Sequence, residues 1–289
     1  MEVAGTRRSA WIVYAIVGVT SLPILLGYIW LAISTFSERT YGLIPVDHAG
    51  NLGGFTFSNW KFLLKSEIWL VTGNTLILAL GLSAGVCAVS AMAGYSLSRL
   101  DFRGRRFFLT GTLLLQSFPS VTLLIAVYFV LRWLSQVPIL GNVVGYDTLG
   151  GVILVSIAFD LPLGIWLMKG FFDAVSWDIE RAALVDGCSR WRTWWSILLP
   201  QVRPGLFALA IFSFIHGWGS FLIPYSFMID QKRGTIATYL QSLMSNTAPV
   251  NYNTVAAVGL FQLTPVLLFF FVSQKYLLKI FAGGSKGGT

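Results

Sequence analysis

A segment rich in polar and small side chains, residues 171–205, lies between two apolar stretches. Ser176 can cap a helix that begins just after it, because its hydroxyl satisfies an unpaired first-turn amide. Asp178 and Glu180 then fall in the first turn, where the helix dipole favours negative charge. The segment therefore predicts a short helix that ends near Val185.

The residues that follow favour close contact with another surface. Ala182 and Ala183 lack bulk, so a partner can approach them, and Gly187 permits the backbone reversal that ends the helix. A second short helix from Ser189 presents three tryptophans before Pro200 interrupts its continuation. These are Trp191, Trp194 and Trp195. The other interpretation is an ordinary amphipathic loop.

The sequence contains no pattern typical of a catalytic or metal site. It has neither the phosphate-binding pattern G-x-x-x-x-G-K-[ST] nor H-E-x-x-H, and His48 and His216 lie on different segments. Cys87 lies in an apolar stretch and Cys188 in the polar segment, so neither has an evident disulfide or metal-site partner. We expect that this chain is not an enzyme and binds no metal or cofactor itself.

Composition indicates a chain embedded in lipid. Charged residues make up 11% and hydrophobic residues 55% of it, whereas soluble domains contain about 25% charged residues. The net charge of +8 is scattered between apolar stretches instead of being clustered on one surface. This distribution argues against nucleic acid as a partner.

Six stretches approach the roughly 20 apolar residues that a bilayer core requires. They span residues 11–33, 70–93, 107–131, 149–168, 206–228 and 255–276. We therefore expect an all-α integral membrane fold, a single transmembrane domain over residues 1–289 with six transmembrane helices. The first stretch is too long for a signal-peptide core and has no evident cleavage site, so it predicts a retained anchor.

The distribution of basic residues predicts the orientation. With the N-terminus inside, fourteen Lys and Arg residues fall on the inner side and six on the outer side, and cytoplasmic loops carry such an excess. Both termini and residues 171–205 are then cytoplasmic. On the outer side, Ser58 and Asn59 suggest a capped amphipathic helix, and residues 230–253 read as a flexible loop.

A few polar residues lie within the apolar stretches, where an ionisable side chain costs about 2.5–3.5 kcal/mol. Asp160 precedes Pro162 and has two interpretations: binding of substrate hydroxyls, or stabilisation of a kinked helix. Trp218 suits either the apolar face of a sugar or helix packing, and packing is favoured for His216. Interhelical hydrogen bonding is the default role of Asn74, Gln116 and Gln262. Gly81 and Gly85 form a small-residue face suited to close helix contact, also with a partner subunit.

Residues 171–205 resemble the EAA loop of bacterial ABC importer permeases. Ala182-Ala183, three residues, Gly187, nine residues and then Ile197-x-Leu199-Pro200 match that loop in spacing. Where the family has Glu before the alanines, this chain has Arg181, and Glu180 stands one residue earlier. The resemblance implies a cytoplasmic coupling helix that docks on an ATPase, with either Glu180 or Arg181 making the main ionic contact. The coupling residues it implies are Glu180, Arg181, Ala182, Ala183, Asp186, Gly187, Ile197, Leu199 and Pro200.

Two further segments narrow the resemblance to the carbohydrate-uptake branch related to the maltose-type inner-membrane subunit. Residues 274–287 resemble the ending of those permeases, and so do residues 214–224. In the second segment Trp218-Gly219-Ser220 stands where the family shows Trp, Asn and an acidic residue. The residues expected along a substrate path are Asp160, Trp218, Ser220 and Asn74.

The resemblance implies one permease half of an importer in the bacterial inner membrane. Its partners would be a second homologous permease, a dimer of ABC ATPases that bind ATP and Mg, and an extracytoplasmic substrate-binding protein. A permease for glycerol phosphate, polyamines or amino acids is the alternative, although the centres of the six stretches hold no Arg or Lys for a phosphorylated substrate. A secondary transporter is less favoured, because no repeated halves are evident. A membrane enzyme should gather catalytic groups on one face, and none gather here.

Overall fold

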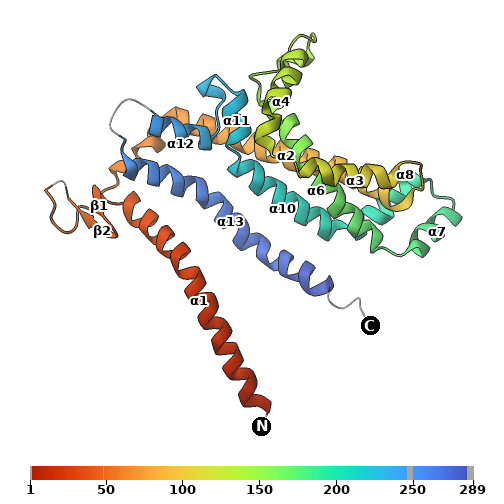
Figure 1. The fold of residues 1–289 in the computed structure, drawn as a ribbon, viewed down its shortest axis with the longest axis horizontal. Helices are drawn as coiled ribbons and strands as arrows, with labels where there is room; N and C mark the ends of the chain where they lie inside the picture. Colours follow the sequence, from red (N-terminus) through yellow and green to blue (C-terminus); the bar gives the residue numbers. More distant parts are fainter. Residues whose placement is uncertain (1, 48, 246–249, 285–289) are drawn as a thin grey trace. The chain divides into compact units, whose positions relative to one another are not determined.

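The computed structural model describes residues 2–47, 49–245 and 250–284. This part of the chain is mostly helical, with one small hairpin (Figure 1). Contacts divide the chain into two units, Met1–Ile68 with Leu240–Pro265 and Trp69–Tyr239 with Val266–Thr289.

The first unit holds a long helix followed by a hairpin and a short 3-10 helix. Its elements are α1 (Glu2–Thr35), β1 (Arg39–Tyr41), β2 (Ile44–Val46) and η1 (Ser58–Leu64). Strands β1 and β2 are antiparallel, with Arg39 opposite Val46. This hairpin departs from the all-α expectation.

Two asparagine amides hold the chain where α1 ends. Nδ2 of Asn59 donates to the carbonyls of Thr35 and Ser37 at 3.2 and 2.9 Å, and Nδ2 of Asn253 donates to those of Ser37 and Glu38 at 2.7 and 3.0 Å. Carbonyls beyond a helix end need such partners when they are buried. The predicted side-chain cap at Ser58 and Asn59 was wrong, because η1 has no side-chain cap and Asn59 is buried against α1 instead.

The second unit contains most of the helical elements. Its elements are α2 (Ser66–Arg99), α3 (Arg105–Gln116), α4 (Ser120–Leu134), α5 (Leu140–Val144), α6 (Leu149–Asp173), α7 (Trp177–Val185), α8 (Arg190–Thr193), η2 (Trp194–Leu198), α9 (Leu199–Gln201), α10 (Arg203–Gly219), α11 (Leu222–Phe227) and η3 (Gln231–Arg233). Helix α2 begins in the first unit, and α12 (Ile236–Ser245) and α13 (Tyr252–Gly284) each pass from one unit to the other along the chain.

Helices α2, α6 and α10 pack together through apolar side chains. One cluster, at the end near α7 and α8, includes the fully buried Met168, Phe172 and Leu198. A second cluster joins α2 and α6 to α4 and α11 through Leu78, Leu131 and their neighbours. These two clusters fix the helices that carry the candidate site.

The helices provide four to six candidate membrane spans. Four are single helices, Val13–Thr35, Ser66–Arg99, Leu149–Asp173 and Tyr252–Phe271. Two more arise only if bent pairs each count as one span, Arg105–Gln116 with Ser120–Leu134 and Arg190–Gln201 with Arg203–Gly219. These long apolar helices therefore fit a multi-pass membrane protein.

Two expected stretches are divided in the structure. Residues 107–131 bend by 106° between α3 and α4, where Pro119 adopts an extended conformation and cannot continue a helix. Residues 206–228 separate into α10 and α11 at Ser220, which is also extended. The expected flexible loop at residues 230–253 contains helix α12, while residues 246–249 lie outside the described part.

Candidate coupling surface and polar groove

The polar segment forms two short helices, as its local signals predict. The hydroxyl of Ser176 accepts from the amide of Asp178 at 3.2 Å, and α7 spans Trp177–Val185. Gly187 has a φ of +81°, and the next amide, that of Cys188, donates to the carbonyl of Ala183 at 3.0 Å. This left-handed glycine closes the helix as expected. The hydroxyl of Ser189 caps α8 by accepting from the amide of Arg192.

After α8 the chain widens into a π-helical turn. Trp194–Leu198 forms η2, followed by α9, which contains Pro200. Pro200 has no amide hydrogen to donate to the preceding turn, and π turns occur where helical hydrogen bonding is rearranged. Pro200 therefore does not end the helix; the 75° bend comes later, before Arg203.

The expected coupling residues divide into an exposed, a buried and a half-buried set. Arg181, Ala182, Asp186 and Gly187 are exposed, whereas Ala183 is 5% exposed. Half-buried positions follow at Ile197, Leu199 and Pro200.

The exposed face also carries apolar side chains. Val185 is 86% exposed, Trp191 64% and Trp195 59%. The ring of Trp194, which is buried, lies between those two tryptophans, with centroid distances of 4.8 and 5.7 Å. Figure 1 places α7 and α8 together at one end of the α2, α6 and α10 bundle. Large exposed apolar patches usually mark an interaction site.

Glu180 belongs to the buried set, because it pairs with a basic residue of this chain. Its Oε2 lies 3.2 Å from Nε of Arg99, and the two side chains are 8% and 1% exposed. The hydroxyl of Tyr95 donates to the other carboxylate oxygen at 2.9 Å. The carboxylate is therefore held inside the chain, and of the two residues considered for an external ionic contact Arg181 is the exposed one, at 72%.

Arg99 also holds the chain that leads into α7. Its Nη2 donates to the carbonyls of Phe172 and Val175 at 2.9 and 2.6 Å, and its guanidinium lies 4.5 Å from the ring centroid of Trp177. One guanidinium thus joins the last turn of α2, the end of α6 and the first turn of α7. Sequence reasoning missed this role and used Arg99 only as an indicator of orientation.

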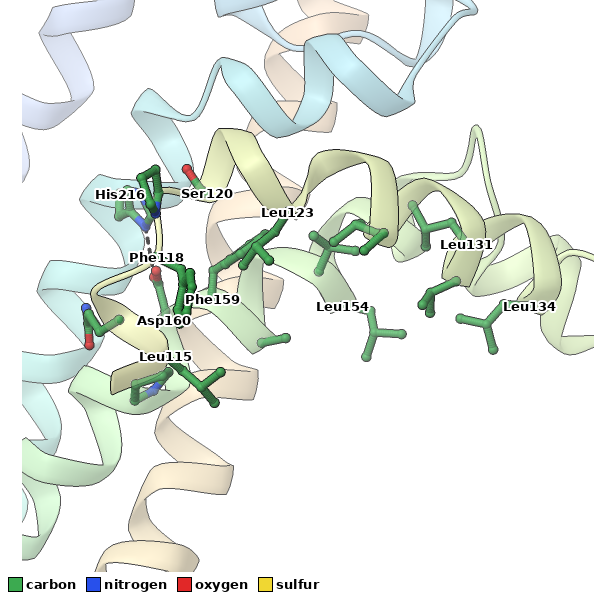
Figure 2. Close-up of a pocket in the computed structure, with 18 residues that line it drawn as sticks. Leu115, Phe118, Ser120, Leu123, Leu131, Leu134, Leu154, Phe159, Asp160 and His216 are labelled. Atoms are coloured by element: carbon green, nitrogen blue, oxygen red, sulfur yellow. Dashed lines mark hydrogen bonds and ion pairs between the residues drawn. The ribbon is translucent and has the colours of Figure 1, made fainter. Parts of the chain in front are cut away.

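A groove of about 800 Å³ opens between α3, α4, α6 and α10. Leucine and phenylalanine side chains from α3, the α3–α4 bend, α4 and α6 line it, and Asp160 and His216 meet at one end (Figure 2). Nδ1 of His216 lies 2.9 Å from Oδ2 of Asp160. Helix α6 continues through Pro162 without a break, so the carboxylate faces α10 across the groove end.

The other residues expected along a substrate path lie in packed positions. Trp218 is 3% exposed and stacks on Phe214 at 6.0 Å, which matches the packing interpretation. Nδ2 of Asn74 donates to the carbonyls of Lys232 and Gly234, both at 3.0 Å. Ser220 is half-buried at the end of α10. None of these three lines the groove, whereas Gln116 does.

The small-residue face of α2 packs within the chain. A Cβ at Gly81 would lie 3.0 Å from Ile153, and one at Gly85 would lie 2.2 Å from Ile157, both on α6. The expected close helix contact is present, and its partner is α6 of the same chain.

Comparison with known proteins decides the family. The family model described as "Binding-protein-dependent transport system inner membrane component" matches residues 78–280, which include the buried Arg99–Glu180 pair and the groove. The chain belongs to this family. As one of these inner membrane components, it shares its family with transport subunits.

The relatives of this inner membrane component include permease proteins of sugar transport systems. It is 30% identical to the maltodextrin transport system permease protein MdxG of Bacillus subtilis over 95% of both chains. It is 28% identical to the trehalose transport system permease protein SugB of Mycobacterium tuberculosis over 99% of both. It is also 28% identical to the diacetylchitobiose uptake system permease protein NgcG of Streptomyces coelicolor, over 98% of this chain and 89% of that one.

Solved structures share the fold of this inner membrane component. A chain of a bacterial ABC transporter involved in the import of the acidic polysaccharide alginate matches with a TM-score of 0.76, at 20% identity over 94% of this chain and 97% of that chain. A second structure, of a bacterial alginate ABC transporter in complex with an alginate pentasaccharide-bound periplasmic protein, matches with a TM-score of 0.67 at 18% identity.

Proposed function

We propose that this chain is a permease subunit of a bacterial ABC importer that moves a sugar or oligosaccharide inward by ATP-driven alternating access. Family membership and the full-length sugar-transport relatives support this function. The structural observation that carries it is the exposed, partly apolar face of α7 and α8. The buried Arg99–Glu180 ion pair holds α7 against α2. A surface that receives force needs both an accessible contact and a rigid connection.

A permease subunit of an ABC importer would work with three kinds of partner. A dimer of ABC ATPases, which bind ATP and Mg, would dock on α7 and α8 from the cytoplasm. A second homologous permease would complete the translocation path, and an extracytoplasmic substrate-binding protein would deliver the solute. The two bent helix pairs would then each count as one span, giving six spans with both termini in the cytoplasm.

In the proposed mechanism, the loop transmits to the membrane helices the difference in how tightly the ATPase binds two states of the permease. An ATPase dimer can shift the permease between two states only if it contacts them unequally. Arg99, in the last turn of α2, binds both Glu180 of α7 and the carbonyl of Phe172 at the end of α6. Displacement of α7 would therefore move the ends of α2 and α6. Asp160 and His216 would lie along the solute path, where paired polar groups can accept and donate hydrogen bonds to hydroxyls.

The docking proposal is tested by placing a charge on the exposed face. Val185→Asp introduces a carboxylate at an 86% exposed position without touching the Arg99 pair. We expect the variant to remain in the membrane with unchanged thermal stability and to lose copurification of the ATPase. Leu52→Asp, at an 82% exposed position outside α7, α8 and the apolar stretches, is the matched control. Normal ATPase capture by Val185→Asp would count against docking at this face.

The cargo proposal is tested by uptake. Cells that lack this chain should lose uptake of one labelled oligosaccharide among maltodextrin, trehalose and diacetylchitobiose, and the restored chain should recover it. Loss of glycerol phosphate, polyamine or amino-acid uptake with sugar uptake intact would favour the non-sugar alternative.

A further inference from the structure

A basic pocket lies at the junction of α2, α3 and α6. It has a volume of about 800 Å³ and opens between the turn that joins α2 to α3 and the last part of α6. Four cationic side chains line it, Arg103, Arg105, Arg106 and Lys169, together with the single acid Asp101. The groove between α3 and α4 shares none of these residues.

Two of the four cations are neutralised by nearby carboxylates. Nη1 of Arg105 lies 3.1 Å from Oδ1 of Asp101, and Nζ of Lys169 lies 2.5 Å from Oδ2 of Asp173. Arg103 and Arg106 are exposed and form no ion pair with any residue in the described part of the chain. The pocket therefore has two guanidinium groups available for an anion from outside.

Apolar rings flank these unpaired arginines. Phe107 is 84% exposed and Phe102 48% exposed, and both line the pocket. Nε1 of Trp166 donates to the carbonyl of Leu109 at 3.3 Å and lies 3.2 Å from Oγ1 of Thr112, which holds α3 against α6 beneath the pocket. Cations beside exposed apolar rings, at the ends of membrane helices, fit the boundary between lipid headgroups and acyl chains.

We propose that this pocket binds the phosphate of an anionic phospholipid from the surrounding leaflet. Arg103 and Arg106 would contact the phosphate oxygens, because the guanidinium fork matches phosphate in a bidentate geometry. Phe102 and Phe107 would pack on the glycerol and the upper acyl chain. This inference rests on the membrane placement proposed above, and it needs neither the ATPase nor a sugar.

The test measures lipid retention by the full chain. Native mass spectrometry of the purified protein compares phosphatidylglycerol with phosphatidylcholine of identical acyl chains. A basic residue near an anionic surface contributes roughly a fivefold gain in affinity, about 1 kcal/mol. Arg103→Gln with Arg106→Gln should therefore reduce the preference for phosphatidylglycerol roughly 25-fold. Arg103→Lys with Arg106→Lys, which keeps both charges, should retain most of it.

A matched double variant separates the pocket from overall charge. Lys61→Gln with Lys65→Gln removes the same charge from exposed positions that do not line the pocket, and it should leave the preference unchanged. Equal loss in this control, or an unchanged preference in Arg103→Gln with Arg106→Gln, would overturn the proposal. Loss of ATPase capture by the arginine variant with its lipid preference intact would assign the pocket to a protein partner instead. Displacement of the lipid by inorganic phosphate alone would assign it to a soluble anion.

Discussion

Arg99 and Glu180 form a buried ion pair, with Nε and Oε2 3.2 Å apart, that connects the last turn of α2 to the first turn of α7. A buried pair gains from mutual attraction only when its remaining polar atoms also find partners. Here the carbonyls of Phe172 and Val175 accept from Nη2 of Arg99, and the hydroxyl of Tyr95 donates to Oε1 of Glu180. Nη1 of Arg99 has no hydrogen-bond partner in the described part of the chain. The position of α7 is thus determined from inside the chain, independently of any partner.

Removing the charge of Glu180 should destabilise the protein strongly. Glu180→Gln leaves the guanidinium of Arg99 buried without its counter-ion, a change that costs about 3–5 kcal/mol in comparable buried pairs. Thermal unfolding in detergent measures the loss, and Arg181→Gln, at a 72% exposed side chain, serves as the control. Exchange of the charges in Arg99→Glu with Glu180→Arg should not recover the stability, because a carboxylate at position 99 cannot donate to the carbonyls of Phe172 and Val175. Equal melting temperatures for Glu180→Gln and Arg181→Gln would contradict the structural role of the pair.

The adjacent alanines of α7 should respond differently to the same substitution. Ala183 is 5% exposed, so Ala183→Leu overpacks the helix interface and should cost about 1–3 kcal/mol of stability. Ala182 is exposed, so Ala182→Leu should leave the melting temperature unchanged and weaken ATPase capture by its bulk. Thermal unfolding and copurification distinguish the two effects. The opposite assignment, with Ala183→Leu stable and Ala182→Leu unfolded, would mean that α7 presents its other face.

The Asp160–His216 pair should affect transport more than stability. Asp160→Asn removes the charge from the carboxylate at the groove end, and a hydrogen bond from a substrate hydroxyl to a charged group contributes about 1.5–3 kcal/mol. We expect the substrate concentration for half-maximal uptake to rise roughly tenfold or more. Asp101→Asn, which does not line the groove, is the charge-matched control. Unchanged uptake kinetics with a lower melting temperature would instead assign the pair to helix packing.

The contact between α2 and α10 should not tolerate even a methyl group. A Cβ at Gly217 would lie 2.8 Å from the Cα of Ala79, so backbone has to move to admit it. Gly217→Ala should therefore cost about 1–3 kcal/mol in thermal unfolding. Gly170→Ala, on α6 with no atom within 4 Å of the added Cβ, should be neutral or slightly stabilising. A melting temperature for Gly217→Ala equal to that of Gly170→Ala would show that the two helices can separate freely.

Local features of the candidate site could be predicted from the sequence. Capping by Ser176, the extent of α7 and the reversal at Gly187 depend on residues within one or two turns, so neighbouring residue types are sufficient to predict them. The pairing of Glu180 with Arg99 could not be predicted in this way. It joins residues far apart in the chain, and a single apolar stretch ending in a basic residue does not indicate which acid will approach it.

Hydropathy agrees with the four single candidate membrane helices, and it did not predict the interruptions of two other stretches. A window of about 20 residues averages across Ser117–Pro119 and across Ser220, where the structure divides the expected stretches. The roles of the residues expected along a substrate path were harder to predict. Asn74 binds loop carbonyls and Trp218 packs on Phe214, both outside the groove. Their chemistry permits several partners, and only the packing of α2, α6 and α10 selects one.

The π-helical turn at Trp194–Leu198 makes the length of the segment between Gly187 and Pro200 a structural parameter in itself. A π turn accommodates one residue more than an α turn, and each residue rotates an α-helix by about 100°. Because the π turn absorbs that extra residue, the helical segments on either side of it keep their facing. Deleting the exposed Ser196 would then return the turn to α geometry without rotating Trp191. Adding a residue would exceed what one turn absorbs and rotate Trp191 relative to α10, while α7 stays held by the Arg99–Glu180 pair.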